Sequence, residues 1–177
     1  MAAGKTTIGR HLARELGLPF VDTDALIAAR SGPIAELFAG GGEPRFREAE
    51  HDAVRAALAG PLAVLALGGG AVTHAPTQAL LADGALRVYL DIPAETLTAR
   101  LRRSRTVRPL VGATPTVARV RALLTAREPA YRAADVIVSG PHPSKLAFAR
   151  AIVAELAAHI DRARVPASDD VEGELST

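Results

Sequence analysis

Short apolar runs alternate along the chain with longer segments in which apolar and polar residues follow a helical spacing. Such runs are typical of strands buried on both faces of a parallel sheet, and the segments between them are typical of amphipathic helices. The pattern therefore predicts an α/β fold in which helices cover a parallel sheet. The predicted strands are residues 19–21, 62–67, 86–92 and 135–138.

The predicted helices begin and end at glycine, proline or capping residues. Between residues 104 and 115, and again from 161 onward, the helical spacing is lost. We expect one domain over residues 1–160 and a disordered, non-catalytic tail over residues 161–177. The predicted helices are residues 5–16, 25–30, 34–38, 43–58, 93–103, 116–127 with an extension over 128–132, and 144–159.

Candidate chemistry begins at Gly4, Lys5 and Thr6, which match the end of the phosphate-loop pattern G-x-x-x-x-G-K-[ST]. In such a loop backbone N–H groups surround the phosphates, the lysine reaches the β and γ phosphates, and the hydroxyl ligates Mg²⁺. The helix predicted to follow directs its positive N-terminal end at the same charge. Short strings of this kind also occur in ordinary turns and helix starts, so these residues alone leave both interpretations open.

Polar or small residues directly follow two of the predicted strands. Asp22 and Asp24 follow the first strand. A carboxylate there commonly holds Mg²⁺ and its water shell, although Asp24 could instead be the N-cap of the next helix. Three glycines, residues 68–70, follow the second strand. They allow either a tight turn or the close approach of a ligand, and their place at the carboxyl end of a strand favours the ligand.

Arginines are concentrated just before and within the irregular segment at residues 104–115. A basic loop can be merely solvated surface, but in a phosphate-handling enzyme it is a candidate lid that brings arginine to the transferred group. Elsewhere, Arg47 and Glu50 are three residues apart on a predicted helix and could form a surface ion pair. The arginines of the basic segment are Arg100, Arg102, Arg103, Arg105 and Arg108.

Composition narrows the function classes. The 177 residues are 49% hydrophobic, which fits one globular enzyme domain. A net charge of +2 and 3% aromatic residues argue against nucleic-acid binding, and the absence of cysteine excludes disulfides and thiolate metal sites. The sequence has neither an apolar run of membrane-spanning length nor the apolar core of a signal peptide. We expect a cytoplasmic protein without nucleic-acid or membrane partners.

Five stretches, in this order and spacing, make the chain resemble the shikimate kinase family over roughly residues 1–158. Each stretch alone is a weak signal, whereas the set is specific. The stretches are Gly4-Lys5-Thr6-Thr7-Ile8-Gly9-Arg10, Asp22-Thr23-Asp24, residues 42–50 (GEPRFREAE), residues 67–72 (LGGGAV), and Arg108-Pro109-Leu110 together with residues 127–132 (REPAYR).

The resemblance implies ATP-dependent phosphorylation of the 3-hydroxyl of shikimate, giving 3-phosphoshikimate and ADP on the pathway to chorismate and the aromatic amino acids. It implies a P-loop, nucleoside-monophosphate-kinase-like three-layer sandwich, whose five parallel strands have the order 2-3-1-4-5. ATP and shikimate are the expected partners, Mg²⁺ the expected cofactor, and a monomer the expected state.

Roles for individual residues also follow from the resemblance. Lys5, Asp24 and Arg108 match catalytic positions, with Asp24 as the partner of the substrate hydroxyl and a possible base, and Arg108 on the lid. Thr6 and Asp22 match the metal positions. The nucleotide positions are Ala2, Ala3, Gly4, Lys5, Thr6, Thr7, Arg100 and Arg108, and the shikimate positions are Asp24, Arg47, Gly69, Gly70 and Arg132.

Two departures from the family pattern keep alternatives open. The strand that should lead into the phosphate loop would precede Met1, and we hypothesise that translation begins upstream. The turn at residues 140–143 lacks the Arg or Asn that many relatives place beside adenine. A related small-molecule kinase of the gluconate kinase type is one alternative, although it should lack the Arg47 and Arg132 pair. A nucleotide-binding protein without activity is the other.

Overall fold

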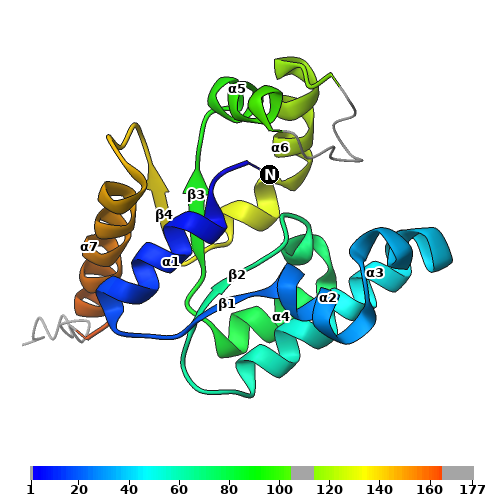
Figure 1. Ribbon diagram of the computed structural model, residues 1–177. Helices are drawn as coiled ribbons and strands as arrows, with labels where there is room; N and C mark the ends of the chain where they lie inside the picture. The colour runs from blue at the N-terminus through cyan, green and yellow to red at the C-terminus, as the bar shows by residue number, and fades with distance from the viewer. Residues whose placement is uncertain (1, 105–113, 165–177) are drawn as a thin grey trace, which may run out of the picture.

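The computed structural model describes residues 2–104 and 114–164. Helices and parallel strands alternate through this part of the chain, as Figure 1 shows. The elements are α1 (Lys5–Leu16), β1 (Phe20–Asp22), α2 (Thr23–Ser31), α3 (Ile34–Leu58), β2 (Val64–Ala66), the 3₁₀ helix η1 (Ala71–Thr73), α4 (Ala75–Gly84), β3 (Val88–Asp91), α5 (Ala94–Arg103), α6 (Val117–Arg132), β4 (Val136–Ser139) and α7 (Lys145–Arg164).

The strands form two parallel pairs. β1 pairs with β2, with Val21 opposite Leu65, and β3 pairs with β4, with Leu90 opposite Val138. The α/β class and the parallel pairing are therefore confirmed. The two pairs match the neighbours 2-3 and 4-5 of the expected five-stranded order, and within residues 2–104 and 114–164 no strand joins β2 to β3. Parallel pairing brings the carboxyl ends of β1 and β2 to the same edge.

One hydrophobic core spans both strand pairs. Ile8 of α1 and Ile152 of α7 are each 1% exposed at its centre. The two helices pack side by side, α1 against β1 and β2 and α7 against β4 (Figure 1). A smaller core lies between α2 and α3 and includes Ile27 of α2 and Phe46 of α3. The close packing explains Gly9, since a Cβ there would lie 2.7 Å from the Phe20 ring.

Several helices differ from their predicted bounds, among them α2, which begins at Thr23 rather than at residue 25. The predicted break at residues 40–42 is present as a kink, where Gly42 has φ 67° within the single segment α3. α6 continues through Pro129 to Arg132, since a proline near a helix end removes only one hydrogen bond. α7 continues to Arg164, so residues 161–164 belong to the folded helix and the predicted start of the tail is wrong there.

Helix α4 was not predicted from the sequence. Only Thr77 and Leu81 of this helix are buried, and its other apolar residues are mostly alanines with no clear helical face. A periodicity argument has little to detect in such a segment.

In the described part of the chain, no helix is both long and apolar enough to span a membrane.

Candidate active site

The residues of the candidate phosphate loop lead directly into α1. Gly4 has φ 90° and ends the turn as the N-cap of α1, and its carbonyl accepts a hydrogen bond of 2.8 Å from the N–H of Ile8. The left-handed conformation at Gly4 is one that side-chain-bearing residues rarely adopt. From α5, Arg100 Nη1 donates to the carbonyls of Ala2 and Ala3, at 3.3 and 3.1 Å. Arg100 therefore holds the start of the loop.

The side chains of Thr6, in the first turn of α1, and Asp22, at the end of β1, contact each other next to this loop. The Thr6 hydroxyl donates to Asp22 Oδ2 over 2.8 Å, and Asp22 Oδ1 accepts the N–H of Asp24 over 3.1 Å. Asp22, not Asp24, is thus the N-cap of α2, and the alternative that gave Asp24 this role is wrong. Asp24 lies in the first turn of α2, half-buried. A threonine hydroxyl and a carboxylate at this place are hard oxygen ligands suited to Mg²⁺.

A buried bond fixes the end of β1 against the end of β2. The Thr23 hydroxyl is fully buried and donates to the carbonyl of Ala66 over 3.1 Å. Ala66 is the last residue of β2, and the three glycines follow two residues later. This bond brings the aspartates at the end of β1 and the glycine loop after β2 to one place.

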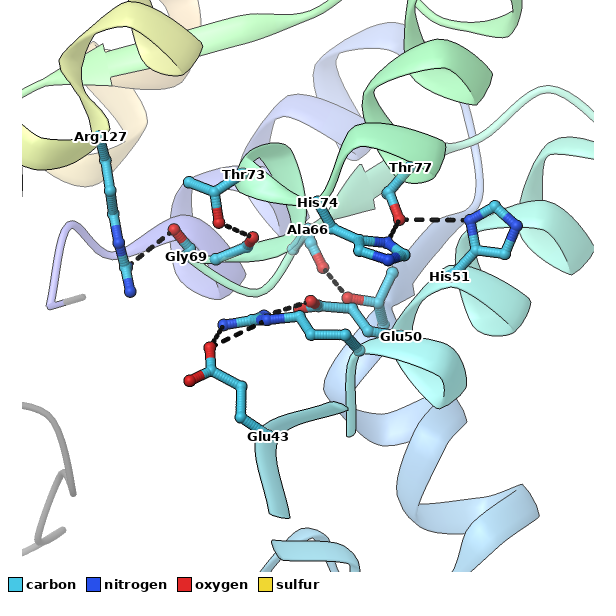
Figure 2. Close-up of polar contacts among 12 residues, drawn as sticks. Glu43, Glu50, His51, Ala66, Gly69, Thr73, His74, Thr77 and Arg127 are labelled. Carbon is cyan, nitrogen blue, oxygen red and sulfur yellow. Dashed lines mark hydrogen bonds and ion pairs between the residues drawn. The ribbon is translucent and has the colours of Figure 1, made fainter. Parts of the chain in front are cut away.

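Arg47 and Glu50 form a buried pair beside the glycine loop. Glu50 is 1% exposed and its Oε2 accepts from Arg47 Nη1, so the interpretation of this pair as a surface ion pair is wrong. Glu43 Oε1 accepts from Arg47 Nη2 over 2.8 Å and from Nε over 3.3 Å. Figure 2 shows Glu43 and Glu50 with the contacts that they make at this place. An arginine has five N–H donors and three of these are used here, which leaves two.

The glycines at 68 and 70 make room for this pair. A Cβ at Gly68 would collide with Glu50 Oε1 and lie 3.4 Å from Asp24 Oδ1, and a Cβ at Gly70 would collide with the Arg47 guanidinium. The glycines with positive φ in the described residues lie elsewhere, so backbone strain does not explain these two. Close approach of side chains explains them, and it brings Asp24, Glu50 and Arg47 to one loop.

Helix α6 holds Gly69 from the opposite side. Arg127 Nη1 and the Tyr131 hydroxyl both donate to the Gly69 carbonyl, at 3.0 and 2.7 Å. Figure 2 shows Arg127 reaching the glycine loop from its helix. The Tyr131 ring stacks on Tyr89 of β3, with centroids 5.0 Å apart. Sequence reasoning missed Arg127 and Tyr131, although their spacing of four residues places them on one face of a helix.

The predicted site residue Arg132 lies apart from this cluster. Its Nη2 is 3.3 Å from Asp91 Oδ2 and its Nε is 3.4 Å from Glu128 Oε1, and its side chain is half exposed. The structure therefore brings Arg127, rather than Arg132, to the loop that Arg47 contacts. The predicted lid residue Arg108 lies outside the described residues.

Hydrogen bonds also hold the far side of the glycine loop. The Thr73 hydroxyl donates to the Gly70 carbonyl over 2.7 Å. The buried Thr77 hydroxyl bonds the Nδ1 atoms of His74 and His51, at 2.9 and 3.3 Å (Figure 2). The glycine loop is thus bonded by Thr73 of η1 and by α6, while Thr77 joins α4 to α3 and to the residue that follows η1.

Electrostatics around Glu50 are unusual for a carboxylate. Burial raises the pKa of Glu50, and the nearby Asp24 carboxylate raises it further, while the bond to Arg47 and the charge of His74 oppose the shift. One carboxylate oxygen, Oε1, is buried without a hydrogen-bond partner in the described part of the molecule. An unsatisfied buried oxygen is costly, and a ligand hydroxyl would satisfy it.

Comparison with known proteins decides the family. The family model for shikimate kinase matches residues 1–158. The chain belongs to the shikimate kinase family. The shikimate kinase of Mycobacterium avium is 48% identical over 160 residues, which are 88% of this chain and 89% of that protein. The shikimate kinase of Nitrobacter winogradskyi is 44% identical over 140 residues, 78% of this chain and 65% of that protein.

Solved shikimate kinase structures have the same fold. That of Acinetobacter baumannii, which is in complex with shikimate, has a TM-score of 0.82 and 35% identity, and the match covers 89% of both chains. That of Aquifex aeolicus has a TM-score of 0.76 and 28% identity over 90% of this chain and 94% of the other. The expected family and activity are therefore confirmed. The chain is a kinase of the shikimate pathway, and kinases of this family use ATP.

Proposed function

We propose that the chain transfers the γ-phosphoryl group of ATP to the 3-hydroxyl of shikimate, at the site between the start of α1 and the glycine loop. The observation that supports this most is the meeting of Arg47, Arg127, Asp24 and Glu50 around residues 68–70. Guanidinium groups suit a small carboxylate, and carboxylate oxygens suit its hydroxyls.

The nucleotide is held by the phosphate loop. Backbone N–H groups of Ala2 to Thr7 surround the phosphates, and Lys5 contacts the β and γ phosphates. Arg100 orders the start of the loop through the carbonyls of Ala2 and Ala3. The hydroxyl of Thr6 and the carboxylate of Asp22, 2.8 Å apart, are the groups that would hold Mg²⁺. Bound there, Mg²⁺ neutralises charge that develops on the transferred group.

The acceptor is held by the groups at the glycine loop. The two N–H donors left on Arg47, together with Arg127, bind the shikimate carboxylate. Glu50 keeps Arg47 in place and offers Oε1 to a shikimate hydroxyl, while Asp24 orients the 3-hydroxyl and accepts its proton. Lys5 and the lid residue Arg108 stabilise charge on the phosphoryl group. Such positioning and charge stabilisation supply most of the catalysis of phosphoryl transfer.

The finer features of the fold belong to the same proposal. β1–β2 and β3–β4 are the two halves of one parallel sheet in the family order 2-3-1-4-5, to which they contribute strands 2, 3, 4 and 5. The kinase domain ends with α7 at Arg164 and acts as a cytoplasmic monomer without nucleic-acid or membrane partners. Support comes from the pairing observed in each half and from the core that α1 and α7 share.

Steady-state kinetics of three arginine variants test the substrate site. We expect Arg47→Ala and Arg127→Ala to raise the KM for shikimate by about 10-fold to 100-fold, with the KM for ATP nearly unchanged, because a bond to a charged group contributes about 1.5–3 kcal/mol. Arg132→Ala is the matched control on α6 and should change the shikimate KM by less than about threefold, since its partners are Asp91 and Glu128.

Gluconate is the control substrate for the same assay. ADP release that depends on shikimate and not on gluconate supports the proposed acceptor. An unchanged shikimate KM in both Arg47→Ala and Arg127→Ala would contradict the proposal that shikimate binds at the glycine loop. A large effect of Arg132→Ala alone would mean that Arg132, and not Arg127, binds the shikimate carboxylate.

A further inference from the structure

Lys145 begins helix α7 close to the phosphate loop. Ser144 precedes it and caps the helix, as its hydroxyl accepts the N–H of Ala147 over 3.0 Å. α7 packs along α1 (Figure 1), and the Lys145 side chain lies near Gly4, the N-cap of α1. Lys145 and Lys5 are the only lysines of the chain. Both lysines therefore belong to helix starts at the same site.

The Lys145 side chain lies over the glycine of the loop. A Cβ built on Gly4 would be 2.9 Å from Lys145 Nζ and 3.2 Å from Cε. Gly4 is the residue directly before Lys5, in the turn whose backbone N–H groups face the phosphates in this kind of loop. The ammonium of Lys145 is thus held within contact distance of the place where the phosphate chain runs.

The charge of Lys145 has no counter-ion in the described residues. None of the carboxylates in residues 2–104 and 114–164 forms an ion pair with it. The side chain is half-buried, and burial together with the nearby positive charge of Arg100 lowers the pKa of its ammonium. A partly buried cation without an anion is unfavourable, and a bound anion relieves this cost.

We propose that Lys145 is a nucleotide-binding residue, which contacts the phosphate chain of ATP where it passes Gly4. The inference rests on the proposed binding of ATP at this loop. A lysine suits the place because its ammonium is a compact charge on a flexible stem, which can follow the phosphate chain. Its role is to bind charge, so it strengthens the binding of nucleotides with phosphates and has no effect on nucleosides.

Binding measurements on Lys145→Ala and Lys145→Arg test this role. Calorimetry with ADP and with adenosine separates a charge contact from a change in the fold, because only ADP carries phosphates. We expect Lys145→Ala to weaken ADP about tenfold and to raise the KM for ATP similarly, with adenosine affinity and shikimate KM unchanged. Lys145→Arg should keep most of the ADP affinity. Arg150→Ala is the matched control, since Arg150 lies on α7 and pairs with Glu15 at the surface.

A Lys5→Ala variant separates failure of this proposal from failure of the proposed function. If Lys5→Ala weakens ADP binding and Lys145→Ala does not, the role of Lys145 is overturned and the phosphate loop remains. Equal losses for ADP and adenosine in Lys145→Ala would also overturn it, because they indicate a structural effect. If the unaltered chain binds ADP no better than adenosine, the phosphate loop itself is not functional and both proposals fail.

Discussion

A single buried carboxylate organises the acceptor site at the residue scale. Glu50 uses Oε2 to hold Arg47 and leaves Oε1 beside Gly68 and Asp24. A buried charge is retained at a cost in stability, which fits a group whose partner arrives with the substrate. The pair therefore prepares Arg47 for a carboxylate and presents an acceptor for a hydroxyl at the same time.

Replacing Glu50 tests this arrangement. We expect Glu50→Gln to raise the KM for shikimate about tenfold, because Arg47 loses its buried anchor and Oε1 becomes part of a neutral amide. Glu43→Gln removes the other carboxylate from Arg47, but the Glu43 side chain is 57% exposed, so we expect a change of less than about threefold. Equal effects of the two variants on the shikimate KM would contradict the importance of burial.

Most residues of the candidate site could be predicted from the sequence because they lie at the ends of helices and strands that the chain pattern predicts. Gly4, Thr6 and Asp22 belong to a loop and a strand end whose positions follow from the chain pattern. Arg127 and Arg132 of α6 show the limit. Treating residues 128–132 as an extension rather than as helix hides the fact that Arg127 and Tyr131 share a face, whereas Arg132 shares the next face with Glu128.

At the scale of elements, one ion pair fixes the start of β3 against the start of β4. Asp135 accepts three hydrogen bonds from Arg87, of 2.7 Å from the backbone N–H, 3.0 Å from Nε and 2.8 Å from Nη2. This bidentate contact lowers the pKa of Asp135 from 3.8 to about 2. It sets the register that places Leu90 opposite Val138 in the core.

Acid titration of stability tests this contact. Because the folded pKa of Asp135 lies below its ordinary value, its contribution is fully present above pH 3.8 and is lost as the pH falls toward about 2. We expect Asp135→Asn to lower the free energy of unfolding at pH 7 by about 1–2 kcal/mol, a figure reduced for partial exposure. The difference from the unaltered chain should shrink as the pH falls through about 2, the folded pKa of Asp135.

Urea unfolding at several pH values measures this difference. Asp52→Asn is the control, since both side chains of the Asp52 and Arg55 pair are 61% exposed, and it should change stability by less than about 0.5 kcal/mol at any pH. A difference between Asp135→Asn and the unaltered chain that is constant from pH 7 to pH 2 would mean that ionisation of Asp135 has no part in its effect.

For the whole molecule, the four strands and their order along the chain were predictable, and the joining of the two strand pairs was not. Each apolar run became a strand of the expected direction, because such runs need burial on both faces. Pairing between strands distant in the chain leaves no local mark in the sequence. In the described residues α1 and α7 share a core that joins the halves and includes Ile8 and Ile152, and α6 bonds the glycine loop after β2.

A strand added to the chain tests whether the two pairs are halves of one sheet. We would place about six apolar, β-branched residues and a Gly-X pair directly before Met1, which completes the pattern G-x-x-x-x-G-K-[ST]. If the added strand pairs with β2 and β3, it buries apolar surface and satisfies their free edges, so we expect the free energy of unfolding to rise by at least about 3 kcal/mol. The same extension with two prolines in the strand is the control, because proline cannot donate the hydrogen bonds of a central strand. Equal urea midpoints for the two extensions would contradict the single-sheet arrangement. A higher midpoint and a lower KM for ATP in the first extension alone would show that the added strand supports both the sheet and the phosphate loop.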